Sequence, residues 1–190
     1  MNVGIVVEGP GDAAAYPVLM RRIRNDIGEL QVRQCGGKYR LQRVFLSFLN
    51  EFHLNHAWQI NVAFVIRDSD CKPPQEIEEQ LREVLYASGF RHFPVEFFAT
   101  KCQLETWLLA DENAVNEVSR KRGKNNRADA VPGQLESYKD AKKRFHQMLT
   151  IAGLPVTPAV YREIAQCVDI ARIEERCPWF PQFILRVRGC

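Results

Sequence analysis

The sequence predicts an α/β fold, with a mostly parallel sheet covered by helices on both faces and a C-terminal helical extension. Through the first 115 residues, short β-branched runs alternate with stretches of helical periodicity. This order is typical of parallel strands joined by helical crossovers. The apolar runs at residues 2–7 and 62–66 show no polar alternation, which indicates strands that are buried on both faces.

The predicted elements follow one another along the chain in a regular order. The first strand ends at Glu8, and Asp12 is placed to cap the helix that follows. Pro73 and Pro74 open a later helix that ends near Gly89. The expected strands are residues 2–7, 30–33, 59–66 and 93–99, and the expected helices lie near residues 13–23, 39–52, 73–89 and 104–111.

The character of the chain changes after about Val115, so we predict an α/β domain at residues 1–115 and a basic helical extension at residues 116–190. Residues 119–133 read as a polar, basic loop, with helices near residues 135–152 and 158–173 and a docked apolar segment at residues 177–185. Lys and Arg against Asp and Glu number 12 to 15 in the first part and 14 to 8 in the second, or −3 and +6. This asymmetry suggests one part that holds cations and another that meets an anionic polymer. The alternative is an ordinary basic surface.

Composition excludes several classes of protein. No apolar run approaches the roughly 18 residues that a membrane-spanning helix needs, and the N-terminus lacks the pattern of a signal peptide. The six cysteines are irregularly spaced without a CxxC pair. We therefore expect free thiols in a reducing compartment, the cytoplasm. The cysteines are Cys35, Cys71, Cys102, Cys167, Cys177 and Cys190.

Three acidic residues follow predicted strands. Glu8 comes directly after the first strand, and Asp68 and Asp70 come after the third. Ligands gather at the carboxyl ends of parallel strands, and Mg²⁺ prefers hard oxygen ligands such as carboxylates. The three acids together therefore predict a site for Mg²⁺ or Mn²⁺. Taken singly, each acid is better explained as a cap or a solvated turn residue.

The residues around these acids resemble a known domain. Residues 6–12 resemble the first Toprim motif, an apolar strand followed by Glu-Gly-x-x-Asp, and residues 64–70 resemble the second, an apolar strand followed by Asp-x-Asp. Residues 102–111 resemble a Glu-x-Trp-Leu-Leu-Ala-Asp signature, and residues 169–183 an Arg-x-Pro-x-Phe-x-x-Phe element. In this order the four segments resemble domain-of-unknown-function family 4276, a bacterial Toprim-like family related to OLD-family nucleases. The sequence departs from many Toprim domains in carrying Cys71 where glycine follows Asp-x-Asp.

The resemblance implies a Toprim-like sheet and a metal-dependent nuclease with one or two Mg²⁺ or Mn²⁺ ions. Glu105 is the candidate for a further acidic ligand, or alternatively a solvent-facing residue on an amphipathic helix. Asp12 is a ligand, a partner of metal-bound water, or only the helix cap. Glu8 is also a candidate general base. For a catalytic lysine, Lys38 follows a glycine pair, and Lys101 lies about one helical turn from Glu105.

The basic loop is the expected nucleic-acid contact, and it shows no base-reading pattern. Its cationic residues are Arg120, Lys121, Arg122, Lys124 and Arg127. The resemblance also implies an ATPase partner and a role in bacterial antiviral defence. Two alternatives to a nuclease remain, a non-catalytic module that binds metal, nucleotide or nucleic acid and signals to a partner, and a pure interaction protein. The sequence does not decide between DNA and RNA or set the oligomeric state.

Overall fold

In the computed structural model, which describes all 190 residues, four parallel strands form one sheet. The strands are β1 (Val3–Val7), β2 (Leu30–Gln34), β3 (Val62–Asp68) and β4 (Val95–Thr100). They lie in the order β2-β1-β3-β4, and every pairing is parallel, which confirms the predicted α/β class. The chain leaves β1 for β2 on one side and returns to β3 on the other. The carboxyl ends of β1 and β3 therefore meet at the reversal point, where open parallel sheets bind ligands.

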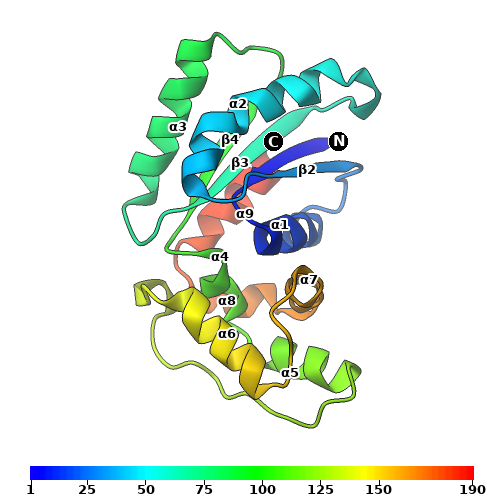
Figure 1. The fold of residues 1–190 in the computed structure, drawn as a ribbon, viewed down its shortest axis with the longest axis vertical. Helices are drawn as coiled ribbons and strands as arrows, with labels where there is room; N and C mark the ends of the chain where they lie inside the picture. Colours follow the sequence, from blue (N-terminus) through cyan, green and yellow to red (C-terminus); the bar gives the residue numbers. More distant parts are fainter.

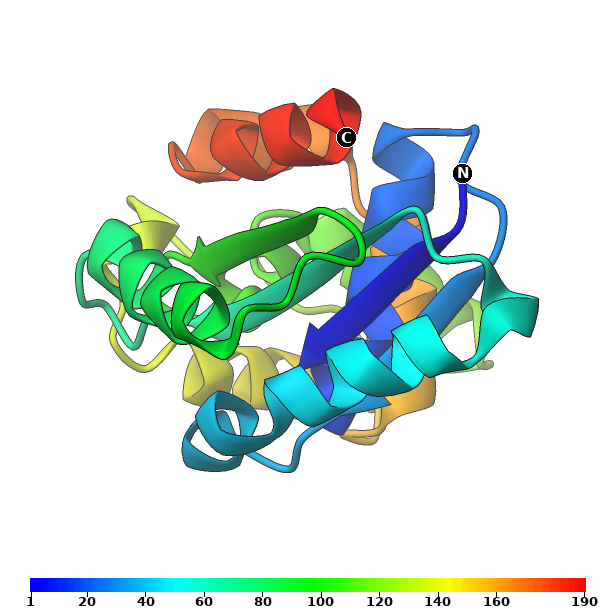
Figure 2. The same cartoon turned by 90° about the horizontal axis from the view of Figure 1, so that it is seen from above.

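Helices cover both faces of the sheet (Figure 1, Figure 2). On one face lie α2 (Lys38–Leu54) and α3 (Pro74–Ser88), which bury a smaller core against β1, β3 and β4. On the other lie α1 (Pro10–Ile23) and α9 (Phe180–Gly189). The longest helix, α2, has 17 residues, and none of the helices combines the length and the apolar character needed to cross a membrane.

The remaining helices form the lower part of the molecule in Figure 1. They are α4 (Leu104–Leu108), α5 (Glu112–Lys121), α6 (Ala141–Ile151), α7 (Pro158–Cys167) and α8 (Ile170–Arg176), with short 3-10 turns at His56–Trp58 and Leu135–Ser137. The single helix expected near residues 158–173 is two helices, because Asp169 caps a new one by accepting from the backbone N–H of Ala171. Asp111 begins α5 in the same way through the N–H of Asn113. The expected boundary near residue 115 thus falls inside α5.

A cluster of aromatic rings joins the C-terminal segment to the sheet. Trp107 of α4 is fully buried, and its ring centroid lies 4.7 Å from that of Phe180 and 5.1 Å from that of Phe183. Phe98 of β4 and Tyr16 of α1 complete the contact with Trp107. One continuous core therefore runs from the sheet into residues 116–190. It holds α4 and α7 against the carboxyl edge of the sheet.

Candidate metal centre

Two of the predicted acids meet at the reversal point of the sheet. Glu8 is the first residue after β1, and Asp68 is the last residue of β3. The backbone N–H of Asp68 donates to Glu8 Oε1 at 3.2 Å, and Asp68 Oδ1 accepts from the N–H of Leu104 at 3.1 Å. Arg67 Nε lies 3.6 Å from Glu8 Oε1. The sequence-predicted pair is therefore brought together and held by backbone donors.

Asp12 lies beside this pair, although not as the helix cap that the sequence predicts. The helix begins earlier, at Pro10, because proline is favoured in the first turn, where its missing N–H has no partner to lose. Gly9 is the cap, and its N–H donates to Asp12 Oδ2 at 2.8 Å. Gly11 allows α7 to approach, since a Cβ there would lie 2.7 Å from the ring of Tyr161.

Glu105 is the fourth acid, and it is not solvent-facing. Its side chain is 3% exposed and lies at the first turn of α4. Tyr161 of α7 donates its hydroxyl to Glu105 Oε1 at 2.8 Å, and Lys142 Nζ of α6 lies 3.6 Å from the same oxygen. Sequence reasoning missed both Tyr161 and Lys142. Neither carries a local signal, because each reaches Glu105 only through the docking of its helix.

Burial and mutual repulsion tie the four acids into one unit, which we call the acidic pocket: Glu8, Asp12, Asp68 and Glu105. The pKa of Asp12 is raised to about 7, mainly because the side chain is buried and further because Glu105 and Glu8 are negatively charged. The pKa of Asp68 is raised well above its usual range, mainly by burial and further by the negative charges of Asp12, Glu105 and Glu8. Burial also raises the pKa of Glu8, against the opposing effect of Arg67. Four full negative charges at neutral pH would therefore need a compensating cation.

A small cavity of about 170 Å³ lies between the first turn of α1, α4, α6 and the start of α7, and of the four acids only Asp12 and Glu105 line it. Asp12, Glu105, Lys142, His146 and Tyr161 are among its lining residues. A pocket of this size suits one phosphodiester group or a few waters around an ion.

Asp70 lies at the rim rather than in the acidic pocket. Its side chain is 37% exposed and pairs with Lys38 at 2.6 Å, although its charge still raises the pKa of Glu8. Lys38 opens α2 directly after Gly36 and Gly37, which take φ values of +80° and +124°. These left-handed values favour glycine. The turn therefore places Lys38 over the loop after β3.

Lys101 is not one helical turn from Glu105, as the sequence suggests. The helix begins only at Leu104, after Cys102 turns the chain with φ +61°. The ammonium of Lys101 acts on Glu136, whose pKa burial raises to about 7 against the opposing effects of the Trp179 N–H and Lys101. Lys38 and Lys142 are therefore the lysines that approach the acidic residues.

Cys71 and Cys102 form a disulfide, so the prediction of six free thiols is wrong. Their S–S distance is 2.04 Å, and the bond joins the loop after β3 to the loop after β4. The sequence shows no such pairing, because only the adjacency of β3 and β4 brings the two loops together. The other four cysteines are free. The bond ties the Asp70 loop to the chain that leads into Glu105.

Reduction of this disulfide is expected to lower the free energy of unfolding by about 3–4 kcal/mol, because the bond closes a loop across 31 positions and restricts the unfolded chain. Urea unfolding with and without a phosphine reductant measures the loss. The reductant should leave the Cys71→Ser/Cys102→Ser variant unchanged, and Cys167→Ser should respond as the wild type does. Equal stability of oxidised and reduced wild type would contradict this expectation.

The predicted nucleic-acid loop is partly neutralised by ion pairs and lies apart from the acidic pocket. Lys121 pairs with Glu117 at 2.7 Å and Arg122 with Glu163 at 2.6 Å. The other three cations of this loop line a separate hollow that shares no residue with the acidic pocket; they are Arg120, Lys124 and Arg127.

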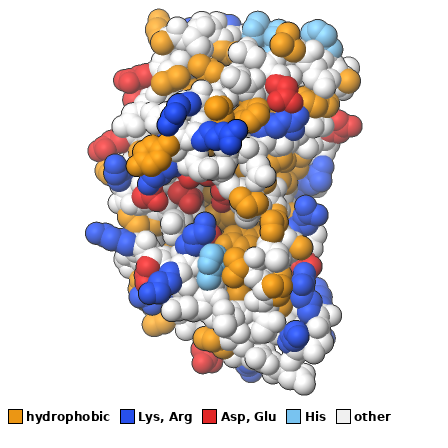
Figure 3. Space-filling view, viewed as in Figure 1, with side chains coloured by type: hydrophobic (Ala, Val, Ile, Leu, Met, Phe, Trp, Pro, Cys, Tyr) orange, Lys and Arg blue, Asp and Glu red, His pale blue; other side chains and the backbone are white.

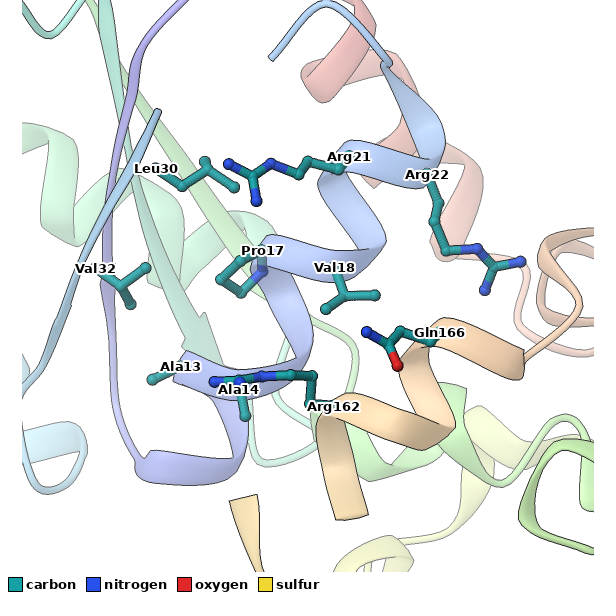
Figure 4. Close-up of a pocket in the computed structure, with 10 residues that line it drawn as sticks. All are labelled: Ala13, Ala14, Pro17, Val18, Arg21, Arg22, Leu30, Val32, Arg162 and Gln166. Carbon is teal, nitrogen blue, oxygen red and sulfur yellow. The ribbon is translucent and has the colours of Figure 1, made fainter. Parts of the chain in front are cut away.

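Another hollow, of about 740 Å³, lies between α1, β2 and α7 (Figure 4). Arginines, apolar side chains and Gln166 line it, and it contains no acid; the arginines are Arg21, Arg22 and Arg162. A hard cation such as Mg²⁺ would therefore bind at the acidic pocket and not in this larger hollow.

The donor set of the acidic pocket fits Mg²⁺ or Mn²⁺ in kind, because it offers only carboxylate oxygens. As the side chains stand, no three His, Cys, Asp or Glu residues could hold one ion together. Ion binding would therefore require the carboxylates to turn toward a common point. Burial, and then mutual repulsion, raise the pKa values of Asp12, Asp68 and Glu8, and a bound cation would offset both effects on the charged carboxylates.

Comparison with known proteins gives one match. The family described as "Domain of unknown function (DUF4276)" matches residues 7–188. Neither a curated protein nor a solved structure matches the chain.

Proposed function

The chain belongs to the DUF4276 family, and we propose that it is a Mg²⁺- or Mn²⁺-dependent nuclease that hydrolyses phosphodiester bonds in DNA or RNA. The observation that carries the proposal is the acidic pocket at the reversal point of the parallel sheet, with Lys142 beside it. Buried carboxylates that repel one another are a costly arrangement unless a cation compensates them. A nuclease uses such a cation directly.

The acidic residues would hold one or two ions; they are Glu8, Asp12, Asp68 and Glu105, with Asp70 as a further ligand once it leaves Lys38. Bound metal supplies an activated water and offsets charge on the scissile phosphate. Tyr161 holds Glu105 in place through its 2.8 Å hydrogen bond. Lys142 offsets charge on a phosphate oxygen in the pocket. Glu8, whose pKa is raised, accepts a proton from the attacking water when it is not bound to metal.

A second candidate is a non-catalytic module of the same fold that binds metal or nucleic acid and signals to a partner. The ion pair between Asp70 and Lys38 and the absence of three preset ligands favour it. Cleavage assays with acid-pocket variants separate the two candidates.

The resemblance of the sequence to a Toprim-like family supports one further proposal, an ATPase as the protein's partner in antiviral defence. Activity assays should therefore be run both with the protein alone and with the ATPase encoded beside it. We also propose a cytoplasmic location, on the four free cysteines and the absence of a CxxC pair, although a disulfide such as Cys71–Cys102 is rare in that compartment.

Mn²⁺ is expected to raise the melting temperature of the wild type by about 5–10 °C at a concentration 100-fold above its Kd, since such binding adds about 2.7 kcal/mol. Asp68→Asn should show a much smaller shift, because it loses a ligand that lies inside the pocket. Asp129→Asn, an exposed acid of the basic loop, is the matched control and should shift as the wild type does. Equal shifts in wild type and Asp68→Asn would count against a specific site.

A further inference from the structure

A basic groove runs along α6 next to the acidic pocket. Its volume is about 820 Å³. The groove is lined by Gln103, Lys139, Asp140, Lys142, Lys143, His146, Gln147, Thr150 and Ile151. Asp140 is already paired with Arg144, whereas Lys139 and Lys143 have no acidic partner within 4.0 Å. The groove therefore presents unpaired positive charge, which attracts a phosphate backbone.

The groove adjoins the small cavity that Asp12 and Glu105 line. Lys142 and His146 line both the groove and this cavity, and Lys142 Nζ lies 3.6 Å from Glu105 Oε1. Figure 3 shows acidic side chains in the middle of this face, with Lys and Arg side chains both above and below them. A backbone that follows the groove therefore reaches Asp12 and Glu105 past Lys142 and His146.

A second anchoring point lies at the start of α2, beyond the acids. Lys38 contacts Asp70, and its ammonium lies 5.4 Å from the ring centroid of Tyr39. Tyr39 is 70% exposed and packs against no core. An exposed aromatic ring beside a lysine is the arrangement on which unpaired bases stack. The backbone N–H of Gly37, the residue before Lys38, donates to the carbonyl oxygen of Glu8 at 2.9 Å, which places this corner beside the acidic pocket.

The acids themselves are recessed. The side chain of Glu105 is 3% exposed and that of Glu8 15% exposed. Duplex DNA is stiff, with a persistence length of about 50 nm, and its stacked bases cannot reach Tyr39. A single strand bends into a recess and offers each base face for stacking.

We propose that the substrate is single-stranded nucleic acid, held across the acidic pocket between the α6 groove and the Lys38–Tyr39 corner. This inference rests on the proposed nuclease function and specifies its substrate class. The contacts are with phosphates and base faces, so the strand is selected for its flexibility rather than its sequence.

Fluorescence anisotropy tests the proposal with fluorescein-labelled dT20, rU20 and a 20-base-pair duplex, in EDTA so that no cleavage occurs. Both single strands should bind at least about 10-fold more tightly than the duplex. The plot of log affinity against log salt for dT20 should have a slope near −2.8, at about 0.7 per phosphate contact for four lysines. These lysines are Lys38, Lys139, Lys142 and Lys143.

Amino-acid substitutions test where on the protein the single-stranded nucleic acid binds. Lys139→Ala/Lys143→Ala should reduce the slope by about 1.4, and Tyr39→Ala should weaken binding by about 10-fold or more without changing the slope. Lys124→Ala/Arg127→Ala, which removes two cations from the separate loop hollow, is the matched control and should change neither quantity. Circular dichroism verifies that each surface variant is folded.

Two results would overturn the proposal: a duplex that binds as tightly as dT20, or a slope that falls in the loop variant and not in the groove variant. The outcomes also separate this inference from the nuclease function. Metal-dependent cleavage that survives with normal dT20 affinity in the groove variant refutes the strand path and leaves the nuclease intact. Groove-dependent dT20 binding without any cleavage supports the strand path and refutes the nuclease.

Discussion

Asp68→Asn is expected to lower metal-dependent cleavage of a labelled single strand by about 100- to 1000-fold while leaving its affinity in EDTA nearly unchanged. The carboxylate of Asp68 is buried, and the charges of Asp12, Glu105 and Glu8 act on it. Removing one preorganised electrostatic group from an active site typically costs a factor of this size. The carboxamide has the same shape and can still accept from the Leu104 N–H, so the fold should survive.

Single-turnover cleavage with Mn²⁺ measures this effect, and two further variants calibrate it. Lys101→Ala should cleave at the wild-type rate, since its ammonium acts on Glu136 and not on the acidic pocket. Asp70→Asn should lose less activity than Asp68→Asn, because Asp70 lies at the rim in an ion pair with Lys38. Cleavage that persists in Asp68→Asn at the wild-type rate would assign the activity to another site or to a contaminant.

The metal-free protein is expected to lose stability as the pH rises from about 4 to about 7. Asp12 has a pKa of about 7 in the folded state against 3.8 as its ordinary value. The folded state therefore binds more protons than the unfolded state across this interval, and deprotonation favours unfolding. The Asp12 contribution amounts to up to about 4 kcal/mol, at 1.36 kcal/mol for each pKa unit. Urea unfolding in EDTA, repeated at several pH values, measures it.

Asp12→Asn should flatten this loss, since the amide does not titrate and the repulsion on Asp68 also falls. Asp26→Asn is the control, because the pKa of Asp26 is lowered in the folded state whereas that of Asp12 is raised. Arg24 lowers the pKa of Asp26, so its contribution is lost only as the pH falls through that low folded value. The plot of unfolding free energy against pH for Asp26→Asn should therefore run parallel to that of the wild type between pH 4 and pH 7. A wild-type curve parallel to that of Asp12→Asn would contradict the raised pKa of Asp12 in the folded state.

The sequence by itself determined the strands, the class of fold and the place of two acids. Apolar runs such as residues 62–66 can only be buried, and a chain that alternates such runs with amphipathic helices builds a parallel sheet. Glu8 and Asp68 follow from the ends of their strands, because a strand's end is visible in the local pattern. The family resemblance was equally local, and the match over residues 7–188 confirms it.

The break between α7 and α8 at Asp169 was not predicted, although the signal was local. Asp169 is a good helix cap, but the apolar periodicity continues across it, so the pattern alone suggested one helix.

Only the tertiary structure decided which other groups join the acids. Tyr161 reaches Glu105 across 56 positions of sequence, and Lys142 comes from a different helix again. Asp70, two residues from Asp68, is nevertheless directed outward to Lys38. Cys71 and Cys102 meet because β3 and β4 are neighbours. These contacts depend on the order of the strands and on how α6 and α7 pack against the sheet. That packing is the summed effect of many weak apolar contacts between distant residues, which no short stretch of sequence encodes.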